Sequence, residues 1–332
     1  MYILYFDSGT TNTRAYLLRE GVLIKQKNKQ IGAKDSALEK DNSRLIQELY
    51  KMYIEIADEC GISTDDIEHI YLSGMISSPS GLIEIEHLST PVDKTKLRNQ
   101  IYKYKEDRCF SRILEIVPGI KTIERGKNVG IEDIAKVDMM RGEEIEIFGI
   151  LSDHKELMKG KKVILMPGSH TQAVFVTDGV ITNISSNIAG ELFSAIVKGT
   201  ILGASVSGNE DWVIDHKMVA LGGEHVHQYG FDRALYRIRI LDLFTDASLN
   251  QRRSYLEGVL NVGIMDDIVR TFDRELRDAD SEKIQIAILG DKIRQEVFQA
   301  FFELLYTKFE LYIIEQKQNI PYSVRGILAL TQ

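Results

Sequence analysis

The stretch Tyr2–Ile24, YILYFDSGTTNTRAYLLREGVLI, reads as an apolar strand, a tight polar turn, a second strand and a Glu-Gly reversal. Gly9 permits the backbone angles of such a turn, and the amides and hydroxyls after it are placed to donate to phosphate oxygens. Asp7, at the end of the first strand, is placed to hold Mg²⁺ through its water shell. The stretch predicts a phosphate-binding hairpin, with a solvated hairpin turn as the alternative for the motif alone.

A second copy of this hairpin occupies Val163–Ile181, VILMPGSHTQAVFVTDGVI. With Thr13 set on Thr171, Gly21 falls on Gly179, an offset of 158 residues in a chain of 332. A hairpin repeated at half-length spacing predicts an internally duplicated α/β fold, with two lobes that each offer a phosphate-binding turn to a shared cleft. The expected lobes are residues 1–151 and 152–332.

Composition is that of a globular protein with two cores, since 44% of the 332 residues are hydrophobic and 27% are charged. The formal net charge of −8 argues against nucleic-acid or membrane-surface binding, because both need a basic face. Cys60 and Cys109 are too few for a disulfide framework, and no segment approaches the roughly 20 apolar residues of a membrane span. We therefore expect a cytoplasmic enzyme, and the sequence leaves a homodimer open.

A loop after a predicted strand is a candidate substrate site. The apolar strand at His69–Leu72 ends before Gly74 and Met75, and the loop Ile76–Pro91 that follows carries Glu84. Ligands often bind to long loops at strand ends in α/β sheets. A surface connection with solvated acids is the alternative.

The segment Val137–Ile145, VDMMRGEEI, places two carboxylates at the start of a short predicted helix. Glu143 and Glu144 follow Arg141 and Gly142, directly before the second hairpin. First-turn acids can simply complement the helix dipole. A helix that connects the lobes would instead carry a carboxylate into the cleft.

A strand-Gly-helix junction lies near the C-terminus. Ile284–Leu289, IQIAIL, is predicted as a buried strand, and Gly290-Asp291 turns it into a helix expected to reach about Gln316. Such a junction can pass beneath an adenine ring, or it can be only a turn. His225-Val226-His227 is predicted as extended, and we assign it no metal because no third ligand accompanies it.

Motifs along the whole chain resemble those of the 2-dehydro-3-deoxygalactonokinase family. That family resembles the actin, Hsp70 and hexokinase superfamily, whose members have two ribonuclease-H-like lobes with nucleotide between them. The resemblance therefore implies the duplicated fold inferred from the hairpins. The motifs that carry it are DSGTTNTRA, LSGMISSPSGLIEIEHLSTP, VPGI, MMRGEE, ILMPGSHTQAVFVTDGVI, IAGELF, YLEGVLNVGI, AILGD and SVRGILAL.

The resemblance implies transfer of the γ-phosphoryl group of ATP to the 6-hydroxyl of the sugar acid 2-dehydro-3-deoxy-D-galactonate. It implies that Asp7 holds Mg²⁺ and that Gly290 and Asp291 lie near the adenosine. The residues expected around the β- and γ-phosphates are Gly9, Thr10, Thr11, Asn12 and Arg14, opposite a second turn of Gly168, Ser169 and His170.

The general base follows from the same resemblance. Related carbohydrate kinases carry this carboxylate in a Gly-Asp pair at the head of the helix before the second hairpin, and Gly142-Glu143 takes that place here. We therefore predict Glu143 as base, with Glu144 and Asp138 as rivals. Arg141 would steady the substrate carboxylate or the transferring phosphoryl group.

The chain departs from the family at several positions. The family has Trp where Ser8 stands, Lys-Trp where Gln172-Ala173 stands, Gly at Ser77, Trp at Leu82, Pro-Tyr at Glu86-His87 and Thr-Gly-Glu at Ala189-Gly190-Glu191. We expect Ser8 to contact the acceptor, together with Gly74, Met75, Glu84 and Glu144, and Gln172 to line or buttress its site. A kinase of a different sugar or sugar acid, and a nucleotide-binding regulator without kinase activity, remain alternatives.

Overall fold

The computed structural model describes residues 1–123, 129–275, 285–315 and 320–331. The chain forms two compact units. Unit 1 comprises Met1–Lys159, Thr177–Asn183 and Gln316–Gln332, and unit 2 comprises Gly160–Val176 and Ile184–Glu315.

Unit 1 extends past the expected boundary after residue 151, which falls inside helix α4 (Glu143–Asp153). It also includes the last helix, α11 (Tyr322–Thr331), which the sequence assigned to the second half. A Cβ on Gly326 of α11 would overlap the carbonyl oxygen of Ile145 in α4. The two helices therefore cross with their backbones in contact, and this packing holds the C-terminal helix in unit 1.

The main sheet of unit 1 has six strands in the order β3-β2-β1-β4-β7-β6. Strand β1 pairs antiparallel with β2 and parallel with β4, so Asp7 lies between Arg14 on one side and Ser73 on the other. The strands are β1 (Tyr2–Ser8), β2 (Thr13–Arg19), β3 (Val22–Lys29), β4 (Ile67–Gly74), β6 (Tyr102–Glu106) and β7 (Arg112–Ile116).

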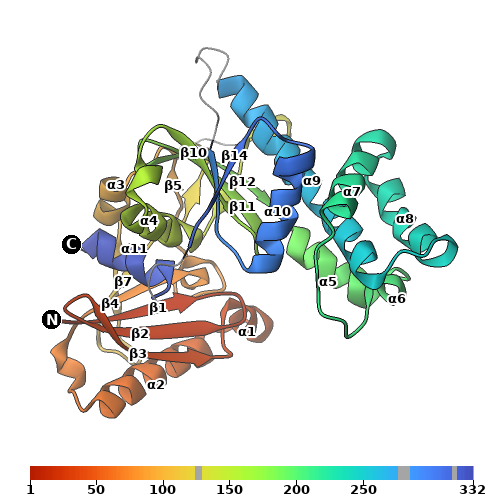
Figure 1. The fold of residues 1–332 in the computed structure, drawn as a ribbon. Helices are drawn as coiled ribbons and strands as arrows, with labels where there is room; N and C mark the ends of the chain where they lie inside the picture. Colours follow the sequence, from red (N-terminus) through yellow and green to blue (C-terminus); the bar gives the residue numbers. More distant parts are fainter. Residues whose placement is uncertain (124–128, 276–284, 316–319, 332) are drawn as a thin grey trace. The chain divides into compact units, whose positions relative to one another are not determined.

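Helices cover both faces of this sheet (Figure 1). Helix α2 (Ser43–Cys60) lies on one face and α11 on the other. Helix α2 buries apolar residues at helical spacing, including Leu45, Leu49 and Ile56. It ends at Gly61, whose φ of 65° suits the left-handed residue that closes a helix.

Short elements complete unit 1. The segments after β4 form a small three-stranded sheet of β5 (Leu88–Ser89), β8 (Ile120–Lys121) and β9 (Met139–Met140). The remaining short elements are α1 (Ala33–Glu39), α3 (Lys94–Asn99) and the 3₁₀ turns η1 (Thr64–Asp66), η2 (Met75–Ser77), η3 (Ile131–Lys136) and η4 (Lys155–Met158).

The second sheet, built mainly from unit 2, has the order β12-β11-β10-β13-β14. This order repeats β3-β2-β1-β4-β7 strand for strand, and the last three strands are again parallel. The predicted duplication and ribonuclease-H-like topology are therefore confirmed. The strands are β10 (Lys161–Met166), β11 (Thr171–Thr177), β12 (Val180–Asn187), β13 (Gln285–Ile288) and β14 (Glu310–Ile313).

The tight reversals of the two hairpins share one backbone conformation. Glu20 and Gly21 have φ of 50° and 79°, and Asp178 and Gly179 have φ of 51° and 77°. Two successive positive φ values are the signature of a two-residue hairpin turn, for which glycine is favoured. The Glu-Gly and Asp-Gly pairs of the two hairpins therefore form the same type of turn.

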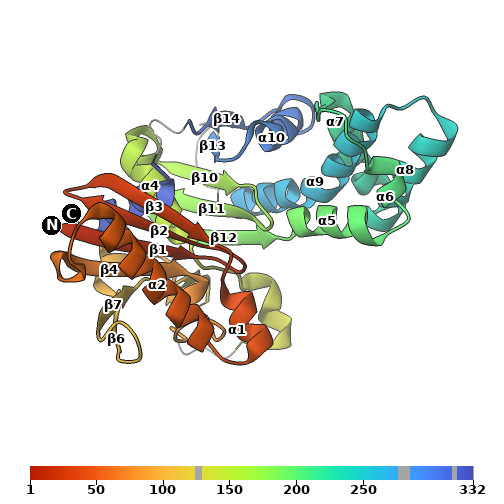
Figure 2. The ribbon, with the colours of Figure 1, turned by 90° about the horizontal axis from the view of Figure 1, so that it is seen from below.

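Helices make up the rest of unit 2, and α6, α7 and α8 gather beside α9 at the end away from the sheet (Figure 2). A Cβ on Gly258 of α9 would overlap the carbonyl oxygen of Val219 in α7, so the backbones of these two helices are in close contact. The helices are α5 (Ala189–Gly199), α6 (Gly203–Val206), α7 (His216–Tyr229), α8 (Phe231–Phe244), α9 (Leu249–Glu275) and α10 (Lys292–Leu304).

Two sequence predictions in unit 2 are wrong. His225 and His227 lie in α7 rather than in an extended segment. The helix after Gly290-Asp291 ends at Leu304 instead of near Gln316, because the chain must return to add β14 beside β13. Ile284 and Gln316, the expected limits of this strand and helix, lie outside the described residues.

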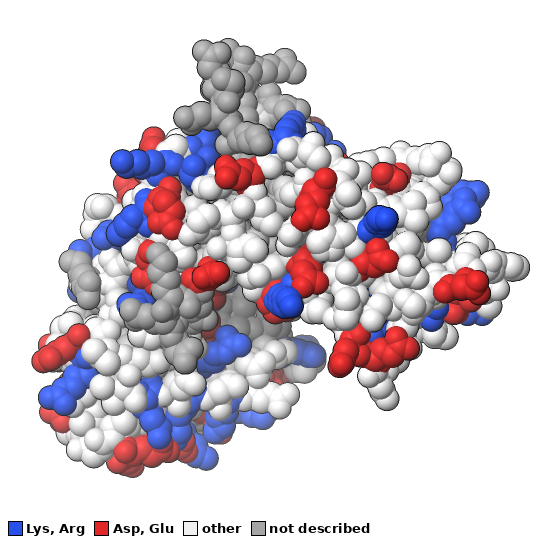
Figure 3. Space-filling view, in the orientation of Figure 1, with Lys and Arg blue, Asp and Glu red and all other residues white. Residues whose placement is uncertain are grey.

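The charge distribution matches the acidic composition. On the face drawn in Figure 3, the described Lys and Arg side chains are interspersed with Asp and Glu and form no continuous basic surface. Within the described ranges, no helix combines the length and the apolar character that crossing a membrane requires.

Candidate active site

The β1–β2 turn of unit 1 is closed by a hydrogen bond from the Gly9 amide to the Asn12 carbonyl oxygen at 2.8 Å. Thr10, Thr11 and Asn12 are exposed around it, as is Arg14 at the start of β2. The structure therefore brings together the residues expected to surround phosphate groups and leaves their polar groups accessible.

The segment that begins at Gly32, just before α1, packs against this turn. The amides of Ala33 and Lys34 donate to the carbonyl oxygens of Gly9 and Thr10 at 3.2 and 2.9 Å. A Cβ on Gly32 would come within 2.5 Å of the same two oxygens. Glycine is therefore needed here for helix α1 to approach the turn so closely.

Ser8 does not face a ligand in this structure. It has no exposed surface, and its Oγ lies 3.0 Å from Thr13 Oγ1, which donates to the Ile31 carbonyl oxygen at 2.8 Å. Leu82 and Ala173, two further departures from the family, are also buried. Because Ser8 is fully buried, the expectation that it contacts the acceptor is corrected.

Asp7 is the acidic centre of the first site. Its Oδ2 lies 3.3 Å from Arg14 Nη1, the residue opposite in β2. Burial raises the pKa of Asp7, and the charge of Arg14 opposes that rise. Burial and the negative charge of Asp7 raise the pKa of Glu146, in the first turn of α4, to about 8. The end of β1 and the start of α4 thus form one acidic region.

The start of α4 lies against the end of β4. Gly142 has a φ of 113°, and a Cβ there would lie 3.3 Å from the Cα of Gly74. Glu143 accepts a hydrogen bond from the Arg141 amide at 3.0 Å and keeps part of its surface exposed. Glu143 is therefore the half-exposed carboxylate of the predicted pair.

Glu144 is fully buried and turns back onto its own helix. Its two carboxyl oxygens accept from the Gly142 amide at 2.9 and 2.7 Å. Burial and the neighbouring charge of Glu143 raise the pKa of Glu144 to about 8. This geometry makes Glu144 a helix cap, and it presents no surface for the substrate contact expected of it.

Arg141 fastens the loop after β4 to α4. Its guanidinium donates to the backbone and side-chain oxygens of Ser77 and lies 3.1 Å from His87 Nε2. Burial, followed by the charge of Arg141, lowers the pKa of His87 to about 4, so this ring is neutral at pH 7. Met75 is half-buried in η2, and Glu84 is exposed on the loop.

The acidic region fits a cation held through water. Among the described residues, no three His, Cys, Asp or Glu side chains lie close enough to ligate a metal ion together. Mg²⁺ keeps most of its waters and is commonly bound by one or two carboxylates plus substrate phosphates. Buried acids with raised pKa values beside an exposed phosphate turn are consistent with that mode.

The β10–β11 turn of unit 2 repeats the support found in unit 1. A Cβ on Gly190 of α5 would overlap the carbonyl oxygen of Gly168, and the Glu191 amide donates to the Ser169 carbonyl oxygen at 3.0 Å. Ser169 and His170 are exposed, and His170 Nε2 lies 3.3 Å from Glu191 Oε1. The predicted second phosphate turn is therefore accessible.

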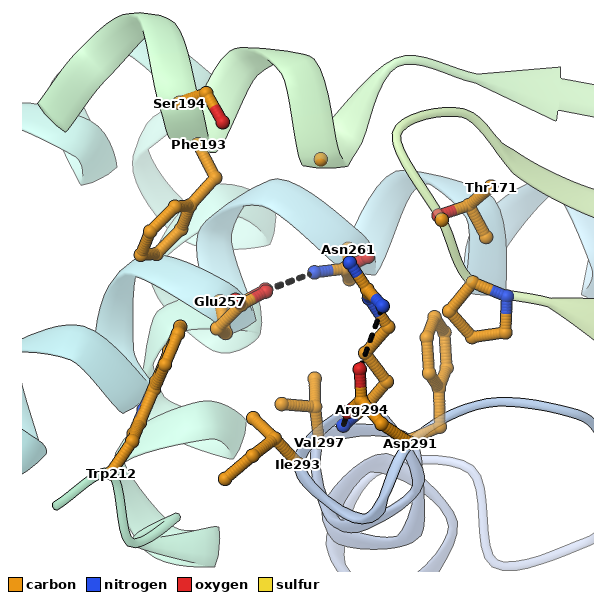
Figure 4. A pocket seen from close by; sticks show the side chains of 14 residues that line it. Thr171, Phe193, Ser194, Trp212, Glu257, Asn261, Asp291, Ile293, Arg294 and Val297 are labelled. Carbon is orange, nitrogen blue, oxygen red and sulfur yellow. Dashed lines mark hydrogen bonds and ion pairs between the residues drawn. The ribbon is translucent and has the colours of Figure 1, made fainter. Parts of the chain in front are cut away.

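A pocket of about 260 Å³ opens beside this turn, entirely within unit 2 (Figure 4). Asp291 lines it and caps α10, because its Oδ1 accepts from the Arg294 amide at 3.0 Å and its Oδ2 lies 2.7 Å from Arg294 Nη1. The lining residues are Pro167, Gly168, Thr171, Gly190, Phe193, Ser194, Trp212, Glu257, Asn261, Asp291, Ile293, Arg294, Val297 and Phe298.

Sequence reasoning missed several residues of these sites. Glu146 follows Glu143 by three positions, so helical periodicity alone places both on one face of α4. Glu257 and Asn261 are four positions apart in α9, inside the YLEGVLNVGI motif. Phe193 and Trp212 carry no local signal for a pocket, although Trp212 is the only tryptophan of the chain.

The chain matches the model of a family described as 2-keto-3-deoxy-galactonokinase over residues 7–315. A curated protein of Rhizobium meliloti (strain 1021), assigned as a 2-dehydro-3-deoxygalactonokinase, is 27% identical over 138 residues. That alignment spans 42% of this chain and 40% of the relative's length. A Sinorhizobium meliloti crystal structure with the same assignment has a TM-score of 0.73 at 17% identity, over 99% of this chain and 97% of that one. The structural match supports the fold.

Proposed function

Because the chain belongs to the 2-keto-3-deoxy-galactonokinase family, we propose that it is an ATP-dependent sugar-acid kinase that phosphorylates 2-dehydro-3-deoxy-D-galactonate at the 6-hydroxyl. The family match over residues 7–315 is the observation that carries this proposal. The exposed turns at Gly9 and Gly168 and the acids beside the first turn support it, since phosphoryl transfer depends on positioning and on charge stabilisation.

Unit 1 is proposed to hold the acceptor and the metal-bound end of the nucleotide. Asp7 orients the water shell of Mg²⁺, and bound Mg²⁺ would screen the phosphate charges. The backbone amides and hydroxyls that follow Gly9 bind the β- and γ-phosphates, and Arg14 adds a positive charge. Their exposure around a rigid turn supports this role.

Glu143 is proposed to take the proton of the acceptor hydroxyl. Of its rivals, Glu144 is buried as a helix cap, and Asp138 lies before β9, outside α4. Burial, followed by the charge of Asp7, raises the pKa of Glu146 to about 8, which favours its protonated form over the carboxylate that a base requires. Glu143 is therefore the acid of α4 best suited to act as base.

Unit 2 is proposed to bind the adenosine and the opposite side of the phosphates. Gly168, Ser169 and His170 form the second phosphate turn. The pocket beside them is lined by Asp291 at the start of α10, and Gly290 precedes this residue. An apolar pocket next to a polar turn is the arrangement that a nucleotide requires.

A different sugar acid is the second candidate acceptor. Arg141 contacts Ser77 and His87, where the resembled family has Gly and Tyr. The contacts that hold the loop next to the proposed base therefore involve two residues, Ser77 and His87, that differ from those of the resembled family. This observation favours a changed acceptor preference within the same reaction.

An ADP-release assay coupled to NADH oxidation tests the proposal. We expect ADP release that depends on Mg²⁺ and on an acceptor, tested with 2-keto-3-deoxy acids, aldonates and hexoses. The highest kcat/KM with 2-dehydro-3-deoxygalactonate would support the proposed substrate, and a preference for another sugar acid would support the second candidate. Nucleotide binding without acceptor-stimulated ADP release would instead favour a regulator.

A further inference from the structure

The pocket of unit 2 is lined by an apolar wall, by the Asp291–Arg294 ion pair and by a polar edge on α9. Phe193 stacks on Trp212 with ring centroids 5.2 Å apart and planes at 27°. The Arg253 guanidinium lies 5.7 Å from the Trp212 ring and donates to the Gly208 carbonyl oxygen at 2.7 Å, so the wall is fixed in place. Ile293 and other aliphatic residues complete the lining. A planar aromatic ligand suits such a pocket.

Glu257 and Asn261, one turn apart on α9, form the polar edge (Figure 4). Asn261 Nδ2 donates to the Glu257 carbonyl oxygen at 3.0 Å and to Glu257 Oε2 at 2.8 Å. Both contacts are to acceptors, which fixes the orientation of the amide and uses both of its hydrogens.

The edge therefore offers two groups to a ligand. Asn261 is 5% exposed, and within the described ranges its Oδ1 has no hydrogen-bond partner. The second group is the remaining oxygen of the Glu257 carboxyl. An acceptor that keeps access to the pocket can take a hydrogen bond from a bound donor.

The charge state of Glu257 refines this picture. Burial raises the pKa of Glu257 to about 7, although the hydrogen bond from Asn261 opposes the rise. A neutral carboxyl donates one hydrogen bond beside the acceptor Asn261 Oδ1. Adenine has a matching edge, because its exocyclic amino group donates and the adjacent ring nitrogen accepts.

We propose that Glu257 and Asn261 read the amino-bearing edge of adenine and so determine which nucleotide the protein accepts. This inference rests on the proposed use of ATP and adds the residues that select the base. Hypoxanthine has a carbonyl oxygen in place of that amino group, so an inosine nucleotide would leave Asn261 Oδ1 unpaired.

Trp212 gives a direct test, because the only tryptophan of the chain lines the pocket. Binding of ADP and of inosine diphosphate to the full chain, with Mg²⁺ and no acceptor, is followed by Trp212 fluorescence and by calorimetry. A satisfied pair of hydrogen bonds to a base discriminates by about 1 to 3 kcal/mol. We therefore expect ADP to bind roughly 10-fold or more tightly than inosine diphosphate.

Variants separate base reading from simple packing. Glu257→Leu and Asn261→Leu should bring the two dissociation constants within about threefold of each other. Glu257→Gln, which keeps one donor and one acceptor, should retain most of the preference. Glu224→Gln, at an exposed acid of α7 that does not line the pocket, is the matched control and should keep the full ratio. Circular dichroism and melting curves show whether each variant is folded.

Several results would overturn the inference. They are equal wild-type affinities, tighter binding of guanosine diphosphate than of ADP, no nucleotide binding by calorimetry, or an unchanged ratio in folded Glu257→Leu. A failure of the proposed kinase function would give a different result: ADP would still bind more tightly than inosine diphosphate, while no acceptor in the panel is phosphorylated. Kinase activity with an unaltered nucleotide ratio in the variants would leave the function standing and remove the base-reading role.

Discussion

The two turns proposed to bind phosphate are supported in the same way and have different residues around them. Gly32 and Gly190 lie 158 residues apart, the same offset as the hairpins, and each packs against carbonyl oxygens of its own turn. Asp7, however, corresponds at this offset to Leu165, which is fully buried. Of the two strands that lead into these turns, β1 of unit 1 carries the acid, whereas the described pocket lies in unit 2.

The difference shows where specialisation arose in a duplicated chain. The repeated hairpin supplies the backbone that each turn needs. The acids of α4 and the pocket residues of α9 and α10 come from segments that the repeat does not share.

Glu143→Gln should cause the largest loss of turnover. Removal of a general base lowers the rate by roughly 10² to 10⁴-fold, while the shape of the side chain is kept. The melting temperature and nucleotide binding should change little, and Glu39→Gln, an exposed acid of α1, is the control. Steady-state ADP release measures the effect. Full turnover in Glu143→Gln would move the base elsewhere, with Asp138 as the next candidate.

Asp7→Asn should raise the Mg²⁺ concentration needed for half-maximal turnover. Residues that hold a metal through an intervening group typically contribute about 10- to 100-fold in metal affinity, and we expect a change of that order. Folding should be preserved, because Asn retains the side-chain size beside Arg14. Titration of activity with Mg²⁺ is the measurement. Near wild-type turnover at limiting Mg²⁺ would contradict the role of Asp7.

The sequence allowed the repeated parts to be predicted better than the unique ones. The hairpins and their reversals follow from local turn chemistry, and the duplication follows from the offset, which is why these features were predictable. Crossing of α11 over α4 depends on a contact between Gly326 and Ile145 that no local pattern reveals. No local pattern reveals the pocket either, because Phe193, Trp212 and Glu257 come from distant segments and meet only in the folded unit.

Burial also separates residues that the sequence could not. Ser8 and Glu144 looked like ligand contacts because they adjoin motif residues, yet both are fully buried and hydrogen-bonded within unit 1. Glu143, adjacent to Glu144, stays half-exposed. Which of two neighbouring acids faces solvent depends on how the helix sits on the sheet, and this is a tertiary property.

Each unit contains a buried acid whose protonation should be visible in the pH dependence of stability. The pKa of Glu144 in unit 1 is raised to about 8, and that of Glu257 in unit 2 to about 7. An acid whose pKa is higher in the folded than in the unfolded state contributes stability at pH values below its unfolded-state pKa, near 4.5. This contribution is lost as the pH rises from there through its folded-state pKa. Wild-type protein should therefore lose stability between about pH 4.5 and 8.

Glu144→Gln and Glu257→Gln should flatten this loss. The slope attributable to one group is at most about 1.4 kcal/mol per pH unit, because Gln has no proton to release. The pH range in which the variant differs in slope from the wild type should extend up to about pH 7 for Glu257→Gln and up to about pH 8 for Glu144→Gln. Melting curves of the nucleotide-free protein from pH 4 to 9 measure it. Variants whose pH profiles parallel the wild type would show that neither acid is protonated in the folded protein.

Gly32→Ala and Gly190→Ala test whether the two turns are built alike. A Cβ on Gly32 would lie 2.5 Å from the carbonyl oxygens of Gly9 and Thr10, and one on Gly190 would overlap that of Gly168. Overpacking of this kind typically costs about 1 to 3 kcal/mol. Gly263→Ala is the matched control, because nothing lies within 4 Å of a Cβ there and Ala favours a helix interior by about 0.5 to 1 kcal/mol. Hydrogen exchange, read separately in each unit, should show the turn of unit 1 loosened by Gly32→Ala and that of unit 2 by Gly190→Ala. If either variant is as stable as Gly263→Ala, its turn does not depend on the glycine beneath it, and the structural equivalence of the two turns fails at that position.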